Sequence, residues 1–165
     1  QKRELTISAH NQFMLRAIEL ARNTSIVTKA GGPFRCVIVK NNEIVGEGAN
    51  SVLADGDSTS HAEMNAIRSA CKKLGTHDLA GCVVYSTGEP CPMCYGACCW
   101  ARVDAIHYAT TIQDATAFGN FDDDIFFEDI KLPSKDRNLA GKELLRDEML
   151  KVWSEFKNMH EKLHY

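Results

Sequence analysis

The chain has 165 residues, 44% of them hydrophobic and 25% charged, and its formal net charge is −3. This size and balance predict one compact domain, residues 1–165, with a sizeable core. No apolar run approaches the roughly 20 residues of a membrane span, and the charged start Gln1-Lys2-Arg3-Glu4 is unlike a secretory signal. We therefore expect a cytoplasmic protein without membrane contact. The acidic balance argues against nucleic acid as a partner, because phosphate binding needs a basic surface.

The cysteines number seven, an odd count for a disulfide framework. Reduced thiols and metal ligation are expected in place of disulfides. Two cysteines belong to the metal motif described below. The other five are predicted to be small core residues: Cys36, Cys71, Cys82, Cys98 and Cys99.

The first part of the chain predicts a helix followed by a hairpin of strands. Apolar residues recur at helical spacing over residues 7–22, which indicates an amphipathic helix. Gly31-Gly32-Pro33 ends helical structure. Residues 34–40 and 43–49 then predict two strands joined at Asn41-Asn42.

The middle of the chain alternates helices with strands. One helix is predicted from about His61 to Leu74, capped by Thr59 or Ser60. A second helix is predicted from about Cys91 to Ala101. The remaining predicted elements are strands 82–86 and 105–109 and short helices 114–118 and 125–130. This alternation predicts an α/β fold with a layered sheet.

The tail, residues 141–165, carries apolar residues close to a 3.6-residue period. It predicts one long helix or a helix pair. The apolar face must be buried either on its own domain or on a neighbouring subunit.

Two short motifs predict a catalytic zinc site: His61-Ala62-Glu63 and Pro90-Cys91-Pro92-Met93-Cys94. One histidine and two cysteines supply three ligands, one fewer than a structural zinc takes, which leaves a position for water. Bound zinc lowers the pKa of such a water from about 16 to about 7. Glu63, two residues from His61, can carry the proton. The arrangement H-x-E…P-C-x-x-C is the signature of zinc nucleobase deaminases.

The predicted helices bring the two cysteines together. Cys91 and Cys94 are three residues apart, hence on one helix face, and the helix N-terminus favours their thiolates. The alternative is a structural zinc with a fourth ligand from Cys98, Cys71 or His107, which the adjacent Glu63 makes the weaker hypothesis.

The chain resembles the cytidine-deaminase-like superfamily, and within it the small guanine deaminases of the tRNA-adenosine-deaminase-like branch. The likeness runs from Gly31-Gly32-Pro33-Phe34 through both zinc motifs to Phe121-Asp122-Asp123. It implies a three-layer α/β/α sandwich with a central mixed sheet, and Zn²⁺ held by His61, Cys91 and Cys94. Glu63 would shuttle protons to a ring nitrogen and then to the departing amine.

The resemblance also implies contacts with the base. Asn50 would hydrogen-bond it, and Phe34, Ala62 and Trp100 would line the pocket. Asp122 would assist proton transfer. The terminal helix can be exchanged between the subunits of a homodimer, so that Tyr165 closes the partner's pocket.

A carboxylate near the leaving amine has independent physical support. Guanine presents N1–H and an exocyclic NH₂ side by side, two donors that suit a two-oxygen acceptor. Asp122-Asp123-Asp124 is also a plain charge run of the kind that forms a solvated turn.

The other contacts have structural alternatives as well. Asn50 can cap a turn, and Phe34 and Trp100 can be ordinary core. Tyr165 can be a frayed end of the chain.

One segment departs from the pattern of the family. Relatives usually have Pro-Phe-Gly-Ala where this chain has Pro33-Phe34-Arg35-Cys36. Arg35 could point to solvent, pair with an acid or donate to a substrate oxygen, so the departure bears on the choice of substrate.

The resemblance implies hydrolytic deamination of guanine to xanthine and ammonia. Isocytosine, ammeline or guanosine are alternative substrates of the same chemistry. A tRNA adenosine substrate is disfavoured by the acidic charge. A non-catalytic zinc module that binds through its terminal helix is the alternative from a different class.

Overall fold

The computed structural model describes residues 7–165, and the charged start of the chain lies outside the described residues. The chain divides into two compact units, residues 1–124 and residues 125–165. The first unit contains the sheet and both zinc motifs. The prediction of a single domain over residues 1–165 stays a prediction.

A four-stranded mixed sheet forms the centre of the first unit. Its strands are β1 (Arg35–Lys40), β2 (Glu43–Ala49), β3 (Cys82–Gly88) and β4 (Ala105–Thr110), in the order β2-β1-β3-β4. β1 is antiparallel to β2 and β3, and β4 is parallel to β3. The predicted hairpin is confirmed, and both turn residues, Asn41 and Asn42, have positive φ, as two-residue hairpin turns require.

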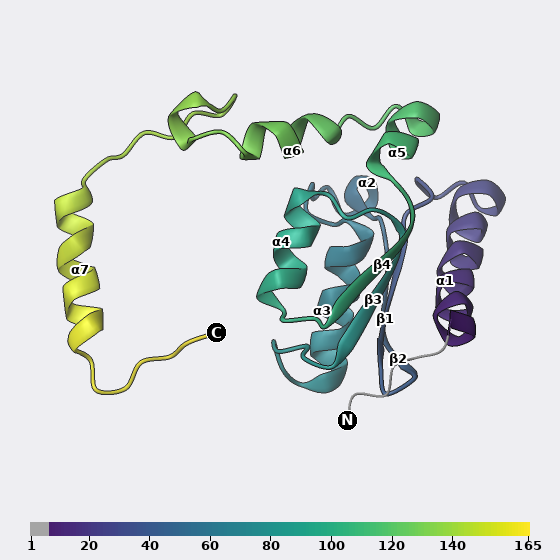
Figure 1. The fold of residues 1–165 in the computed structure, drawn as a ribbon, viewed down its shortest axis with the longest axis horizontal. Coiled ribbons are helices and arrows are strands. Elements are labelled where there is room, and N and C mark those ends of the chain that lie inside the picture. Colours follow the sequence, from purple (N-terminus) through teal and green to yellow (C-terminus); the bar gives the residue numbers. More distant parts are fainter. Residues whose placement is uncertain (1–6) are drawn as a thin grey trace. The chain divides into compact units, whose positions relative to one another are not determined.

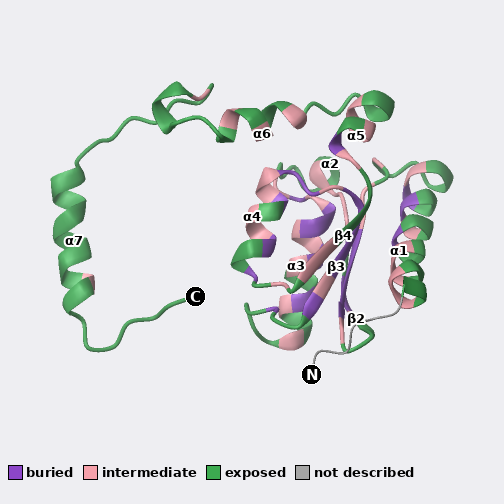
Figure 2. Ribbon diagram, viewed as in Figure 1, coloured by how far each residue is buried: buried purple, intermediate pink, exposed green. Residues whose placement is uncertain are grey.

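Helices cover both faces of this sheet (Figure 1). α1 (Ile7–Arg22) lies on one face, and α3 (Ala62–Leu74) and α4 (Pro92–Trp100) lie on the other. This arrangement confirms the predicted α/β/α sandwich. The buried residues gather on the strands and on the helix sides that face them (Figure 2).

Two glycines of β2 let α3 lie directly on the strand. A Cβ atom at Gly48 would come within 2.1 Å of the Ala62 carbonyl oxygen, and one at Gly46 within 2.6 Å of the Ala66 carbonyl oxygen. Only residues without a side chain permit so close an approach. The start of α3 is thereby fixed against the end of β2.

Several boundaries differ from the predictions. The residue before α3 is His61 rather than Thr59 or Ser60, because Thr59 is bonded to Asp57 in the preceding turn. α5 (Ile112–Gly119) begins two residues before the predicted start, since Thr111 and Asp114 form a capping box. The sequence patterns did not predict the short elements η1 (Asn23–Val27) and α2 (Val52–Asp55).

The cysteine predictions are correct in part. Cys36, Cys82 and Cys98 are buried and Cys71 is half-buried, but Cys99 is exposed. Cys99 lies on the outer side of α4 with Tyr95 and Trp100, and the helix is apolar on both sides, so its pattern does not indicate which cysteine is buried. All seven thiols are free.

The second unit contains α6 (Asp124–Ile130), which starts at the boundary, η2 (Ser134–Asp136) and α7 (Arg146–Asn158). The predicted long helix over residues 141–165 is thus a single helix of 13 residues. Its apolar side chains, including Met149, Val152 and Trp153, are exposed. Burial of this face stays a prediction. Among residues 7–165 no helix is both long and apolar enough to span a membrane.

Candidate metal centre

The three predicted ligands lie at the starts of two neighbouring helices. His61 immediately precedes α3, Cys91 immediately precedes α4, and Cys94 lies in the first turn of α4. Pro92 occupies the first position of α4, where its missing N–H costs nothing. Both helices therefore begin at the group formed by these three side chains.

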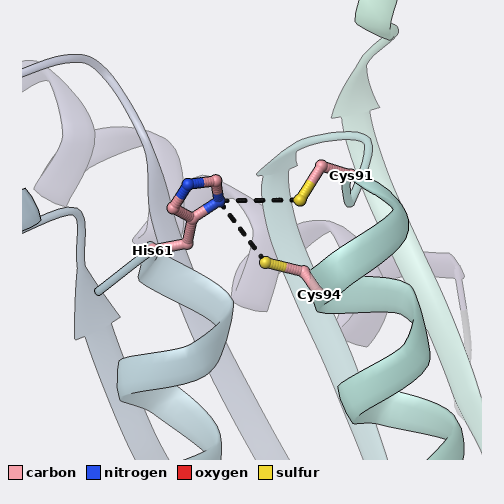
Figure 3. A group of neighbouring side chains, drawn as sticks. All are labelled: His61, Cys91 and Cys94. Carbon is pink, nitrogen blue, oxygen red and sulfur yellow. Dashed lines mark hydrogen bonds between the residues drawn. The ribbon is translucent and has the colours of Figure 1, made fainter. Parts of the chain in front are cut away.

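The ligand atoms are spaced as zinc requires (Figure 3). Nδ1 of His61 lies 3.6 Å from Sγ of Cys91 and 3.6 Å from Sγ of Cys94. In a tetrahedral site with usual Zn–N and Zn–S bond lengths, nitrogen and sulfur lie about 3.6 Å apart. All three ligand atoms lie within 4.8 Å of one another. The donor set and its spacing fit a zinc ion.

The electrostatics of the cysteine pair favour a cation. The hydrogen bond from the Cys94 thiol, helped by the His61 ring, lowers the pKa of Cys91 to about 4. The same contact, with burial, raises the pKa of Cys94 above its ordinary value. The Cys91 thiolate therefore forms readily, and its negative charge opposes ionisation of Cys94. A divalent cation between the two sulfurs stabilises both charges.

The alternative of a fourth protein ligand finds no support among the described residues. The metal-binding group there consists of His61, Cys91 and Cys94. Cys98 is buried in the core that contains Cys36 and Val84. His107 stacks on Tyr85 in contact with the α1 side of the sheet. Three protein ligands with room for water are typical of a catalytic site.

Glu63 is buried beside the ligands. Its side chain is on the first turn of α3 and the residue is 6% exposed. The Ser86 hydroxyl group donates a hydrogen bond of 3.0 Å to Oε1 of Glu63. Burial raises the pKa of the Glu63 carboxyl group, and the bond from Ser86 opposes part of that rise. The carboxyl group is held in one place and suits proton transfer.

Two supporting residues were missed from the sequence. Ser86 follows an apolar run of β3 and projects from the same face of the sheet as buried Val84. A polar residue at such a position indicates a partner inside the protein. Asn65 donates from Nδ2 to the Ala49 carbonyl oxygen at 2.8 Å and to Ser51 Oγ at 2.9 Å. A polar residue on the inward side of the predicted helix was the signal for Asn65. Asn65 thereby bonds to both residues that flank Asn50.

Asn50 caps a turn, which was the alternative to base binding that the sequence left open. Its Oδ1 accepts a bond of 3.2 Å from the Val52 N–H at the start of α2. Its own N–H donates to the Phe34 carbonyl oxygen at 3.3 Å. The amide is therefore oriented with Nδ2 as its donor end. This orientation is compatible with a second role toward a base.

The two predicted aromatic walls have different surroundings. Phe34 is half-buried and meets the ring of Phe121 edge to face, with centroids 4.9 Å apart. Trp100 is 61% exposed at the far end of α4, about 13 Å from Cys91 along the helix. The structure does not bring Trp100 to the cluster within one chain. Ala62, between His61 and Glu63, is buried against Gly48.

The residues of the acidic segment differ in exposure, and the predicted role of Asp122 stays a prediction. Asp122 is exposed, whereas Asp123 is half-buried. Burial raises the pKa of the Asp123 carboxyl group, Cys91 raises it further, and His61 lowers it. The charges of the cluster thus act on the Asp123 carboxyl group. Tyr165 belongs to the second unit and is exposed.

Arg35 bonds to a hydroxyl group of η1, and its role toward a substrate oxygen stays a prediction. Its Nε and Nη2 donate to Thr24 Oγ1 at 3.1 Å and 2.7 Å. Its neighbour Cys36 lies in the core beneath α3, so Arg35 projects from the opposite face of β1. The departure from the family pattern therefore ties η1 to the sheet.

The fold and this cluster define a domain of the zinc-dependent deaminase class. Residues 7–110 match the model of the cytidine and deoxycytidylate deaminase zinc-binding region. The chain belongs to this family, and Zn²⁺ is the cofactor that the family binds.

Known relatives agree with this assignment. The chain is 40% identical to guanine deaminase from Bacillus subtilis over 94% of this chain and 99% of that protein. The crystal structure of a guanine deaminase from that organism covers 94% of this chain and 98% of its own, with a TM-score of 0.87. NE0047 in complex with 2,6-diaminopurine is 32% identical, covering 74% of this chain and 67% of its own, with a TM-score of 0.65. A tRNA-specific adenosine deaminase from Buchnera aphidicola is 39% identical over 62% of both chains.

Proposed function

We propose that this chain is a zinc-dependent deaminase that hydrolyses guanine to xanthine and ammonia. One observation carries the proposal: the grouping of His61, Cys91 and Cys94 beside buried Glu63, in a chain that matches guanine deaminase over nearly its full length. The purine analogue bound to NE0047 supports a small heterocyclic substrate. The proposed setting is the cytoplasm.

His61, Cys91 and Cys94 would hold the zinc ion. Bound zinc lowers the pKa of a coordinated water to about 7, which makes hydroxide available near neutral pH. The N-terminus of α4 favours the Cys91 thiolate, and the bound cation would stabilise the thiolate of Cys94 beside it.

Glu63 moves the protons of the reaction. It accepts the proton that the attacking water loses and delivers it to a ring nitrogen as the C2–O bond forms. It then carries a proton to the amine as the C2–N bond breaks. Guanine and water thus become xanthine and ammonia. The bond from Ser86 keeps the Glu63 carboxyl group oriented for both transfers.

Asn50 and the acidic segment select the base. The Nδ2 group of Asn50 donates to an acceptor on the purine, because its Oδ1 is engaged by Val52. A carboxylate accepts from the N1–H and the amine of guanine. Asp122 was predicted for this role, and the burial of Asp123 beside the cluster favours the neighbouring residue.

The remaining proposed contacts come partly from this chain and partly from a second subunit. Phe34 and Ala62 line the base site from within the chain. The exposed rings of Trp100 and Tyr165 and the exposed apolar side of α7 favour a homodimer. In it, the segment 141–165 is exchanged and Tyr165 closes the pocket of the partner.

A substrate panel tests the proposal. Zinc-loaded protein is assayed for ammonia release from guanine, isocytosine, ammeline, guanosine and a tRNA adenosine stem-loop. We expect kcat/KM for guanine to exceed that of each other substrate by about 10²-fold or more, because a site that hydrogen-bonds its substrate rejects analogues that leave those groups unpaired. Release of ammonia from another compound but not from guanine would contradict the proposal. A wild-type protein inert toward every compound would support the zinc-module alternative.

A further inference from the structure

An aromatic contact joins the start of the sheet to the segment that carries Asp123. Phe34 directly precedes β1, and Phe121 follows α5 by two residues. Their ring centroids lie 4.9 Å apart, with an angle of 77° between the planes. Edge-to-face pairs of this kind are favourable beyond their buried area.

Three glycines make room for the two rings. A Cβ atom at Gly119 would lie 2.6 Å from the Phe121 ring, closer than real Cβ contacts. One at Gly32 would lie 3.2 Å from the Phe34 ring and 3.4 Å from the Phe121 ring, and one at Gly88 would lie 3.3 Å from Phe34. The rings therefore fill space that side chains at these positions would occupy.

The backbone after α5 directs Phe121 back toward Phe34. Asn120 ends the helix in the left-handed conformation, with φ of 56°, and its N–H donates to the Thr116 carbonyl oxygen at 3.1 Å. The Phe121 N–H donates to the Ala115 carbonyl oxygen at 3.4 Å. Past this turn the Phe121 ring packs on Phe34, and the residue is 40% exposed. Asp123 follows two residues later.

Asp123 lies near the metal ligands without belonging to a strand or helix. It is half-buried, and the charges of Cys91 and His61 act on the pKa of its carboxyl group. Phe34 is also bonded to Asn50, whose N–H donates to the Phe34 carbonyl oxygen. One aromatic residue is thus tied to both segments that are proposed to select the base.

We propose that Phe121 is a positioning residue: its ring, seated on Phe34 and above Gly119, holds the segment 120–123 so that Asp123 reaches the substrate. This inference rests on the proposed function. It differs from a role as pocket wall, because Phe121 acts through Asp123 and need not touch the base.

The test combines Phe121→Ala with Asp123→Asn. We expect Phe121→Ala to lower kcat for guanine by up to about 10²-fold with zinc content unchanged, since small misplacements of reacting groups have effects of that size. Phe121→Leu, which keeps an apolar side chain, should recover most of the loss. In the Asp123→Asn background, Phe121→Ala should have no further effect on kcat. Phe118→Ala is the control, because Phe118 is on α5 and 91% exposed.

A second pair of variants tests the contact between the Phe121 ring and Gly119. Gly119→Ala should lower kcat by displacing the Phe121 ring, and it should add nothing to Phe121→Ala. Gly96→Ala on α4 is the matched control, because a Cβ atom at Gly96 meets nothing within 4 Å. A purely structural defect would instead lower the free energy of unfolding of Gly119→Ala both alone and in combination with Phe121→Ala.

Hydrogen exchange separates this inference from the proposed function. Residues 119–123 should exchange faster in Phe121→Ala than in wild type or Phe118→Ala, whichever base the enzyme uses. If wild type does not turn over guanine, the proposed function fails, and exchange in this segment still decides the positioning role. Unchanged exchange overturns the inference. So does a loss of kcat that multiplies with Asp123→Asn, since that result indicates direct contact of Phe121 with the base.

Discussion

The two faces of the sheet are packed with side chains of different size. Beneath α3 and α4 the core is rich in small residues, among them Cys36, Ala66 and Cys98. Beneath α1 it consists of Val37, Val39, Tyr85 and Ala17, with larger side chains packed around them. The metal-binding group and Glu63 lie on the face with small residues.

The difference reflects what each face must position. α3 touches the backbone of β2 through Gly46 and Gly48, so the start of α3, with His61 and Glu63, is placed by main-chain contact. Metal ligation tolerates displacements of only about 0.2 Å. The α1 face places no ligand, and bulky side chains can adjust there. The predictions that follow test this contrast.

The largest effect is expected from loss of the metal. Chelation of zinc, or Cys94→Ser, should abolish guanine deamination, because the attacking water then keeps its ordinary pKa of about 16. Zinc content and ammonia release measure the effect, and added Zn²⁺ should restore the chelated wild type. Cys99→Ser on the exposed side of α4 is the control and should retain both zinc and activity. Equal activity of metal-depleted and zinc-loaded protein would contradict the assignment.

Gly48→Ala should damage the same face through its backbone. The new Cβ atom would lie 2.1 Å from the Ala62 carbonyl oxygen, so α3 must move away from β2. We expect a loss of about 3 kcal/mol or more in the free energy of unfolding, at the upper end for overpacking, together with weaker zinc binding. Urea denaturation and zinc titration measure the two effects. Unchanged zinc affinity would show that the close approach does not place His61.

Ser86→Ala should reduce catalysis without removing the metal. The variant deletes the hydrogen bond to Glu63, and bonds to charged groups contribute about 1.5–3 kcal/mol. A decrease of about tenfold or more in kcat is expected, with zinc content equal to wild type. A kcat equal to wild type would mean that Glu63 is held by other contacts.

Val37→Ala should affect stability on the α1 face and leave the chemistry intact. Val37 is fully buried there, and removal of two methyl groups from a core costs roughly 1–3 kcal/mol. Urea denaturation should show this loss, whereas kcat and KM of the folded protein should match wild type. A fall in kcat would show that the two faces are coupled.

Arg35→Gly, which restores the residue usual in relatives, should have the smallest effect. Arg35 bonds to Thr24 on the side of the sheet opposite Cys36. We expect kcat/KM for guanine to change by less than about threefold, as is usual for substitutions away from the site. A large change in the ranking of substrates would place Arg35 at the pocket after all.

Local signals in the sequence were sufficient for most elements and for the ligands. The periodicity of residues 7–22, the Asn41-Asn42 turn and the spacing of Cys91 and Cys94 each depend on neighbours in the chain. Their predicted structures are confirmed. His61 and the two cysteines are grouped because two helices begin at the same edge of the unit.

Features that depend on distant contacts were not predictable in this way. Arg35 finds Thr24 only after α1 and β1 are packed, and Ser86 meets Glu63 across two elements. Asp122 and Asp123 are equivalent in the sequence, and only the folded chain leaves Asp122 exposed and Asp123 half-buried. The helix predicted over residues 141–165 is longer than α7, because apolar spacing alone does not indicate where a helix ends.

Glu63→Gln tests the central claim most directly. Zinc per chain, xanthine and ammonia are measured for wild type and the variant with guanine as substrate. Wild type should release xanthine and ammonia in equal amounts, and Glu63→Gln should keep its zinc while kcat falls by about 10³-fold, within the range for general acid–base catalysis. A Glu63→Gln protein that retains zinc and deaminates guanine at the wild-type rate would contradict the account.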